Sequence, residues 1–287
     1  MKKTVVLVLL LFIVVLSACS SKDTPVDSAS SDQKKNDKEE QIDSKDSEPE
    51  KNVEKESKEV SKPSETSEPT YMVNPENSSI EPLSEEANEK VVLLTIDDAP
   101  DKYALQMAKT LKELDAGAIF FVNGHFLNTP EEKEVLKKIH EMGFIIGNHT
   151  YSHPFLPDLS TDKQKEEIIK VNKLVEQIIG EKPVFFRAPN GANTAFSEQL
   201  IKEEGMTSMN WSYGYDYFKP YMNTEKLTKA MISGKAPEID IPYSLLKPGA
   251  NLLMHDREWT ANALHDIVVG LRDKGYEILD PHLIQTK

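Results

Sequence analysis

The sequence predicts an α/β fold with a parallel sheet from residue 91 onward. Two observations predict this class: short apolar runs alternate there with helical patterns, and the candidate site residues each follow one of the apolar runs. Buried strands of parallel sheets read as continuous apolar runs, and the connecting helices fill the intervals between them. A barrel-like sheet and a doubly wound sheet both fit this alternation. In either one, a functional site forms at the carboxyl ends of the strands.

Seven short apolar runs are the predicted strands. They occupy residues 91–96, 118–122, 144–147, 184–186, 208–211, 251–254 and 276–279. Between them, Thr129 followed by Pro130 predicts a helix start, and Thr161 with Gln164 has the spacing of a capping box. Four glycines stand where helices are expected to end: Gly143, Gly180, Gly205 and Gly275.

The start of the chain has the pattern of a secretory signal. Two lysines precede an apolar run at residues 5–16, and small residues lead directly into Cys19, the only cysteine. About a dozen apolar residues are too few for a comfortable transmembrane span. The segment resembles a bacterial lipoprotein signal, in which the cysteine is diacylated. An ordinary signal peptide is the alternative, but the small residues directly before Cys19 favour the lipoprotein form. We therefore expect a signal peptide at 1–18, lipidation at Cys19 and an extracytoplasmic protein anchored to the cell membrane.

Residues 19–90 are predicted to be a disordered acidic linker that precedes a folded domain at 91–287. From residue 20 to residue 90 the chain carries 20 acidic and 10 basic residues, with almost no aromatic side chain. Such a composition cannot bury enough apolar surface to offset the entropy of ordering. The linker accounts for most of the net charge of −14. Because the sequence shows no basic patch, we expect no nucleic-acid partner.

Two motifs supply the ligands of an open metal site. Residues 95–100 (TIDDAP) leave the first predicted strand, and residues 149–153 (HTYSH) follow the third. Adjacent side chains point to opposite faces of a regular strand, so Asp97 and Asp98 share one site only where the chain leaves the strand. His149 and His153, four residues apart, can chelate one ion on a helix-like turn. One carboxylate and two imidazoles leave positions open for water and substrate, as in catalytic zinc sites.

Further polar groups follow later strands on the same rim. Arg187 follows the fourth predicted strand, Asp216 the fifth and His255 the sixth. Taken alone, Arg187 is better explained by a buried ion pair and Asp216 by a loop cap. Their position on the rim that also carries the candidate metal ligands favours a catalytic site. Trp211 and Trp259 are expected in the core.

Five short motifs in this order resemble the NodB-type polysaccharide deacetylases of carbohydrate esterase family four, over about residues 90–287. The resemblance implies a distorted (β/α) barrel and a divalent metal, zinc or else cobalt or nickel. It also implies that Asp97 is the general base, while the metal is held by Asp98, His149 and His153.

The later motifs complete the implied site. In Arg187-Ala188-Pro189-Asn190 the arginine orients the base, and Asn190 contributes to the substrate groove. In Asp216-Tyr217 the aspartate holds the catalytic histidine, and Tyr217 belongs to the groove wall. In Leu253-Met254-His255 the leucine lines the pocket for the acetyl methyl group, and His255 is the general acid.

The chain departs from the family pattern next to these residues. Ala99 replaces a usual glycine, which introduces strain if that position needs a positive φ. Asn190 replaces an aromatic residue, typically tyrosine, and Tyr217 replaces tryptophan, so both substitutions change the groove wall. The side chains of the implied base, acid and metal ligands are all present.

The resemblance implies metal-dependent removal of N-acetyl groups from an N-acetylhexosamine glycan. We expect cell-wall peptidoglycan to be the substrate, because the lipid tether holds the domain at the wall, and we expect a monomer. The alternative is a catalytically weak or inactive lipoprotein of the same fold that binds or stabilises the wall. A metal phosphoesterase is disfavoured because only one set of three ligands is found. A glycosidase is disfavoured because adjacent acids do not easily span the separation between flanking carboxylates.

Overall fold

The computed structural model describes residues 68–286. The predicted signal peptide, the lipidation site Cys19 and the linker up to residue 67 lie outside the described residues. None of the described helices is both long and apolar enough to cross a membrane.

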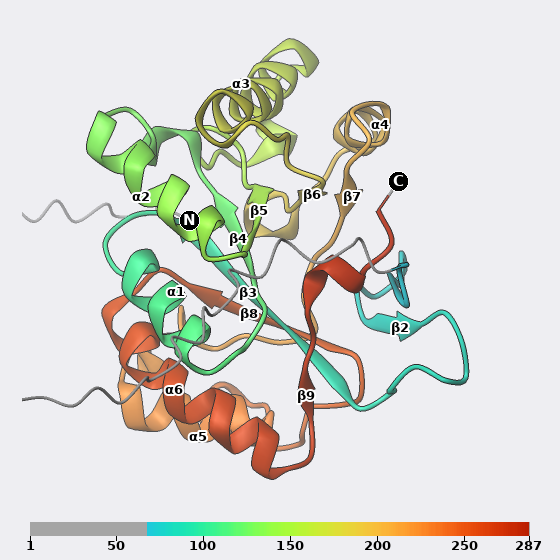
Figure 1. Cartoon of the computed structure of the whole chain (residues 1–287), viewed down its shortest axis with the longest axis vertical. Coiled ribbons are helices and arrows are strands. Elements are labelled where there is room, and N and C mark those ends of the chain that lie inside the picture. The colour runs from blue at the N-terminus through green and yellow to red at the C-terminus, as the bar shows by residue number, and fades with distance from the viewer. Residues whose placement is uncertain (1–67, 287) are drawn as a thin grey trace, which may run out of the picture. The chain divides into compact units, whose positions relative to one another are not determined.

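A curled seven-stranded parallel sheet forms the centre of the described region (Figure 1). The strand order is β7-β6-β5-β4-β3-β8, with β9 also paired to β3. The strands are β3 (Val91–Ala99), β4 (Ile119–Val122), β5 (Ile145–Asn148), β6 (Phe185–Phe186), β7 (Thr207–Ser208), β8 (Ala250–His255) and β9 (Glu277–Ile278). The sequence analysis predicted six of these strands in place and the seventh, β7, slightly too late in the sequence, and the α/β barrel-type class is confirmed.

The fifth predicted strand is the one whose position was wrong. It was expected at 208–211, whereas β7 ends at Ser208. The following residues leave the edge of the sheet and cross to β8, where Tyr213 forms a parallel bridge with Leu252. Irregular backbone therefore connects the two edge strands, and the sheet curls into a half-barrel without a complete ring of strand pairing.

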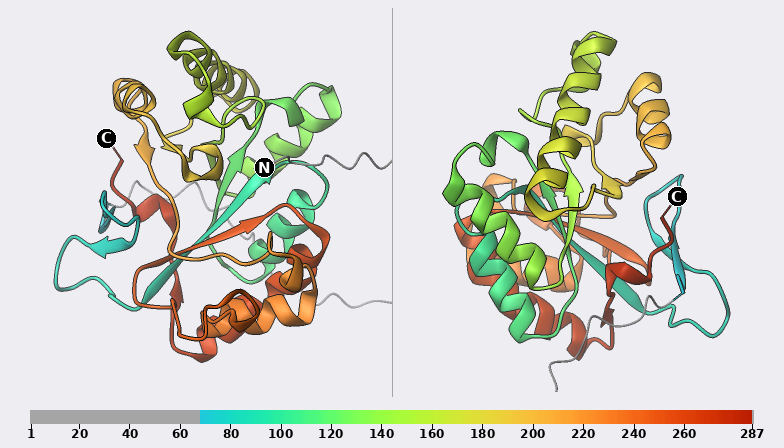
Figure 2. Two further views of the ribbon diagram at one scale, coloured as in Figure 1. Left: turned by 180° about the vertical axis from the view of Figure 1, so that it is seen from behind. Right: turned by 45° about the horizontal axis from the view of Figure 1, so that its top comes forward.

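The six α-helices of residues 68–286 follow the outer face of the sheet, an arrangement visible in Figures 1 and 2. They pack against one another in the order α4, α3, α2, α1, α6, α5, which follows the order of the strands. The helices are α1 (Ala104–Glu113), α2 (Pro130–Glu141), α3 (Thr161–Ile179), α4 (Ala195–Glu203), α5 (Thr224–Ser233) and α6 (Glu258–Asp273). Short 3-10 helices span Gly124–Phe126, Leu156–Asp158, Pro189–Gly191, Lys219–Tyr221, Pro237–Ile239 and Pro281–Leu283.

Local sequence signals explain where several helices start and stop. Thr129 caps α2 in a complete capping box with Glu132, as its position before Pro130 predicts. The predicted capping box at Thr161 is wrong. Ser160 is the N-cap of α3 and accepts a hydrogen bond from the Lys163 N–H, so Thr161 is already the first helical residue. Each of the four predicted terminal glycines has a positive φ at or just beyond a helix end.

Successive side chains of a strand point to opposite faces of the sheet, so the buried side chains are divided between the helix-covered face and the concave face. On β3, Val92, Leu94 and Ile96 point outward to the helices and join the large core there. Val91 and Leu93 point to the concave face and join a second, smaller core. Asp97 continues the inward-facing series, since it lies four residues beyond Leu93. The period of two therefore aims Asp97 into the interior of the half-barrel, at the carboxyl end of the sheet.

An antiparallel hairpin covers the concave face and was not predicted. It consists of β1 (Tyr71–Val73) and β2 (Ile80–Pro82). Tyr71, Val73 and Ile80 are buried in the same core as Val91 and Leu93. Tyr71 also bridges to Ile284, and Figure 1 shows the hairpin beside the C-terminal segment. The expected linker end at residue 90 is thus wrong for residues 68–90, because a few apolar side chains complete a core whose other members lie far away in sequence.

Candidate active site

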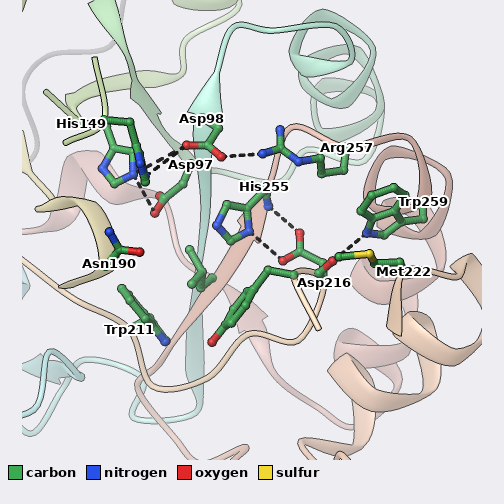
Figure 3. Close-up of a pocket in the computed structure, with 13 residues that line it drawn as sticks. Asp97, Asp98, His149, Asn190, Trp211, Asp216, Met222, His255, Arg257 and Trp259 are labelled. Atoms are coloured by element: carbon green, nitrogen blue, oxygen red, sulfur yellow. Dashed lines mark hydrogen bonds and ion pairs between the residues drawn. The ribbon is translucent and has the colours of Figure 1, made fainter. Parts of the chain in front are cut away.

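A cavity of about 450 Å³ opens at the carboxyl ends of the strands (Figure 3). Nine of the residues singled out from the sequence line it: Asp97, Asp98, His149, His153, Asn190, Asp216, Tyr217, Leu253 and His255. Trp211, Met222, Arg257 and Trp259 complete the lining. Of the described residues predicted for the site, only Arg187 does not line the cavity. It is fully buried and bonded to Asp97.

Asp98, His149 and His153 form a candidate metal centre. Within residues 68–286, they are the one group of three His, Cys, Asp or Glu side chains that could share an ion. Their ligand atoms all lie within 4.8 Å of one another. Oδ1 of Asp98 lies 3.6 Å from Nε2 of His153 and 3.9 Å from Nε2 of His149. Ligand atoms around a tetrahedral ion with bonds near 2.05 Å lie about 3.4 Å apart, so a small inward movement accommodates the ion. The donor set fits zinc and related divalent metals.

The ring of His149 is held in the form that a metal requires. Its Nδ1 lies 2.7 Å from the carbonyl oxygen of Arg187, which fixes a proton on Nδ1 and leaves the lone pair of Nε2 free. Burial lowers the pKa of His149 below its ordinary value, despite the charges of Asp97 and Asp98 that act to raise it. His149 is therefore neutral at physiological pH, as a ligand must be.

The loop between the two histidines is fixed from both sides. Nδ2 of Asn123 donates to the carbonyl oxygen of His149 at 2.6 Å. The backbone N–H and the hydroxyl of Ser152 both donate to the carboxylate of Glu167, on α3, at 2.7 and 2.8 Å. Thr150 and His153 adopt positive φ, which non-glycine residues adopt mostly where surrounding contacts impose it.

An irregularity in strand pairing near the end of β3 places its positive φ on Asp98 and not on Ala99. Asp98 has φ +59°, whereas Ala99 is outside the set of residues with positive φ. Ala99 is also fully buried in the outer core and pairs with Val122 of β4. The departure from glycine at this position therefore introduces no backbone strain.

Asp97 is tied to Arg187 by a short ion pair. Nη1 of Arg187 donates to Oδ1 of Asp97 at 2.7 Å and to the hydroxyl of Thr95, also at 2.7 Å. The guanidinium lies over the ring of Phe121, 4.4 Å from its centroid. That ring leaves no room for a side chain at Gly147, where an added Cβ would come within 2.5 Å of it. Arg187 thus fixes one oxygen of Asp97, while Oδ2 lies 3.6 Å from Nε2 of His149.

The β1–β2 hairpin supports Arg187 through hydrogen bonds to two asparagines. Nη2 of Arg187 donates to the carbonyl oxygen of Asn210 at 2.8 Å and to Oδ1 of Asn251 at 3.3 Å. Ser78, in the hairpin loop, accepts a hydrogen bond on Oγ from the Asn210 N–H at 2.8 Å. Its carbonyl oxygen accepts another from Nδ2 of Asn251 at 3.4 Å. Two intervening asparagines therefore connect the hairpin to the arginine that holds Asp97.

Asp216 holds His255 on the opposite side of the cavity. Nδ1 of His255 lies 2.7 Å from Oδ1 of Asp216, and the other carboxylate oxygen accepts from the His255 N–H and from the Thr260 hydroxyl. Burial acts to lower the pKa of His255, but the charge and hydrogen bond of Asp216 outweigh it and raise the pKa to about 9. His255 is therefore cationic at neutral pH, and its Nε2 is left available as a proton donor.

The cavity wall combines predicted and unpredicted residues. Tyr217 is 42 % exposed, and its ring lies edge-on to that of His255 with centroids 5.5 Å apart. Asn190 has φ +57°, a left-handed conformation that asparagine tolerates well. Trp211 and Trp259 were expected in the core; both are half-buried and line the cavity, and Trp259 also packs against the large core. Trp259 is held there because its Nε1–H donates to the carbonyl oxygen of Asp216 at 2.8 Å.

Arg257 is the principal site residue that the sequence analysis missed. Its Nη2 donates to Oδ2 of Asp98 at 2.7 Å, and its side chain is 36 % exposed. It lies two residues beyond His255, at the start of α6, and no motif marks it. The only available signal was its proximity in sequence to His255.

Comparison with known proteins identifies the family. A model of the polysaccharide deacetylase family matches residues 84–209. The chain is 31% identical over 195 residues to the peptidoglycan-N-acetylmuramic acid deacetylase PdaA of Bacillus subtilis, covering 66% of this chain and 68% of that protein. It is 32% identical over 197 residues to a peptidoglycan-N-acetylglucosamine deacetylase of Bacillus cereus, covering 67% of this chain and 86% of that protein.

Comparison with solved structures points to the same family. A solved carbohydrate esterase family 4 pseudoenzyme from Bacillus anthracis matches with a TM-score of 0.58 and 26% identity, over 66% of this chain and 63% of that one. The chain belongs to the polysaccharide deacetylase family.

Proposed function

We propose that the protein is a metal-dependent peptidoglycan N-deacetylase. The observation that carries the proposal is the set of groups around one cavity: a metal-ligand triad, a carboxylate fixed by Arg187, and a cationic histidine. Hydrolysis of an acetamide needs a polarised carbonyl, a base for the attacking water and an acid for the leaving amine. The cavity offers one candidate for each requirement.

The roles follow from geometry and charge. A divalent metal held by Asp98, His149 and His153 would supply Lewis acidity at the acetyl carbonyl. Asp97, oriented by Arg187, accepts the proton of the attacking water. His255, kept protonated by Asp216, donates a proton to the leaving amine as the C–N bond breaks. Leu253 lines the cavity next to these groups and provides an apolar surface for the acetyl methyl group.

The names of the relatives support a cell-wall glycan as substrate. PdaA is named for N-acetylmuramic acid and the Bacillus cereus relative for N-acetylglucosamine, both in peptidoglycan. We propose zinc as the metal, because two imidazoles and a carboxylate are typical zinc ligands. We also propose that Cys19 is lipidated, so that an extracytoplasmic domain is tethered to the cell membrane beside the wall.

Acetate release tests this function. The full chain, loaded with Zn²⁺, is incubated with N-acetylated peptidoglycan and with chitooligosaccharide, and free acetate is measured with and without a chelator. We expect release that stops on chelation and returns when Zn²⁺ is restored. Absence of acetate from both substrates, with the metal bound, would contradict the proposal.

A second candidate function is wall binding without turnover. One observation in its favour is the structural match to a pseudoenzyme of the same family. A second is Asn190, which lines the cavity where the family usually has an aromatic residue. Glycan binding by the zinc-loaded protein, with no acetate release from any wall preparation, would support this candidate and exclude the first.

A further inference from the structure

Arg257 occupies a place in the site that the proposed reaction leaves unexplained. It precedes the first residue of α6 and reaches back across the cavity rim to the end of β3 (Figure 3). Its Nη2 donates to Oδ2 of Asp98 at 2.7 Å, and its Nη1 donates to the carbonyl oxygen of Asp256 at 2.9 Å. The arginine is therefore anchored to the backbone of the preceding residue and bonded to a candidate metal ligand.

The two oxygens of Asp98 have different partners. Oδ1 faces both imidazoles, at 3.6 Å from His153 and 3.9 Å from His149, while Oδ2 is bonded to Arg257. We propose that Arg257 is a positioning residue for the metal centre, which fixes the Asp98 carboxylate so that Oδ1 alone is presented to the ion. The inference rests on the metal site of the proposed function.

Asp98 needs an external partner to define its orientation. Rotation of an aspartate carboxylate about its last torsion is broad and roughly two-fold, so the rotamer itself does not select one oxygen. Asp98 also lies at positive φ, where the pairing of β3 with β4 becomes irregular. A hydrogen bond from Arg257 to Oδ2 removes this freedom before an ion arrives.

Asp256 holds Arg257 and the end of β3 in a fixed relation. Its backbone N–H donates to the carbonyl oxygen of Asp97 at 3.0 Å, and its carboxylate accepts from the N–H groups of Asp101 and Tyr103, each at 2.6 Å. Asp256 is 1% exposed. Residues 256 and 257 therefore hold the chain on both sides of Asp98, at the end of β3 and in the segment that follows it.

The positive charge of Arg257 and its hydrogen bond to Asp98 have opposite effects on the affinity for a metal ion. A cation close to the site repels a divalent ion, and loss of this repulsion would strengthen metal binding. The side chain of Arg257 is 36% exposed, so solvent screens its charge. Loss of a hydrogen-bond partner behind a metal ligand typically weakens metal binding by about 10–100-fold. We therefore expect orientation to outweigh repulsion.

Metal affinity of three variants tests the inference. Zn²⁺ dissociation constants are measured for the full chain by competition with a chromophoric chelator. Arg257→Met removes the donors, Arg257→Lys keeps the charge and one donor, and Arg272→Met is a control at an arginine outside the cavity. We expect binding about 10–100-fold weaker for Arg257→Met, partial recovery for Arg257→Lys and no change for Arg272→Met.

The visible spectrum of the Co²⁺-loaded protein gives a second readout, because it reports coordination number. We expect Arg257→Met to shift it toward higher coordination, since Asp98 is then free to bind through both oxygens. Zn²⁺ binding by folded Arg257→Met as tight as in the wild type, or tighter, would overturn the inference and leave the proposed function intact. No Zn²⁺ binding by the wild type would contradict the metal site itself.

Discussion

Asp97 and His255 are register partners on adjacent parallel strands. Asp97 lies on β3 and His255 opposite it on β8, one residue row in the same sheet. Neighbouring strands lie about 4.8 Å apart, and both side chains point to the concave face. Each has its own buried partner, Arg187 for Asp97 and Asp216 for His255. The sheet thus sets the spacing of the proposed base and the proposed acid, while a separate buried side chain holds each of them in place.

The pH dependence of the reaction depends on the Asp216–His255 pair. The raised pKa of His255 means that its protonated form is complete well below pH 9 and is lost as the pH rises through that value. A bound divalent ion adds positive charge to the cavity, which disfavours the protonated form of His255, so the basic limb of the loaded enzyme lies at or below pH 9. In Asp216→Asn the carboxylate charge is gone, and we expect the limb to move down by about 1–3 units. A pH–kcat profile measures this, and an unmoved basic limb would show that His255 is not the acid.

Loss of Arg187 is expected to destabilise the protein as well as to reduce its activity. Arg187→Met leaves Asp97 buried and without its ion-pair partner, which costs about 3–5 kcal/mol. Arg187→Lys recovers only part of this, because a single ammonium cannot reproduce the fork that bonds Asp97, Asn210 and Thr95. Urea unfolding measures both variants. Wild-type stability in Arg187→Met would mean that the pair contributes nothing to the fold.

Metal binding should raise the melting temperature. An ion that binds only the folded state stabilises it by about 2.7 kcal/mol when its free concentration is 100 times Kd. Calorimetry with and without Zn²⁺ tests this, and Asp98→Ala and His153→Ala should each remove the shift. Equal zinc-induced shifts in these variants would place the ion elsewhere in the chain.

The hairpin loop should contribute to stability through Ser78. In Ser78→Ala the N–H of Asn210 loses its acceptor, a change that costs about 1–3 kcal/mol when the group stays buried. We also expect a lower kcat, because Asn210 in turn accepts from Arg187. Ser79→Ala, at the neighbouring and more exposed position, is the matched control. Identical unfolding midpoints for the two variants would contradict this role.

Local signals predicted much of the fold and the rim of the site. Continuous apolar runs gave the strands of the parallel sheet, and Thr129 and the terminal glycines gave helix boundaries, because each signal acts within a few residues. The hairpin was missed because β1 and β2 have three residues each and depend on contacts with Val91 and Ile284. Its surroundings in sequence, rich in Ser, Glu and Pro, resemble a linker.

Trp259 and Arg257 were missed as site residues for the same reason: the contacts that place them are with residues distant in sequence. Trp259 is oriented by the carbonyl oxygen of Asp216, and Arg257 by the carboxylate of Asp98, 159 residues away in sequence. No local pattern predicts such a contact. In contrast, the carboxyl-end rule for parallel strands was sufficient to bring Asp97, His149 and His255 together, because it depends only on strand order and direction.

Mass spectrometry of peptidoglycan fragments tests the central claim most directly. Wall material is digested after incubation with the zinc-loaded wild type or with Asp97→Asn, whose metal ligands are intact. We predict loss of acetyl groups from one sugar type with the wild type, and a rate about 10²–10⁴-fold lower with Asp97→Asn. Fully acetylated fragments after wild-type treatment, or equal deacetylation by Asp97→Asn, would contradict the account.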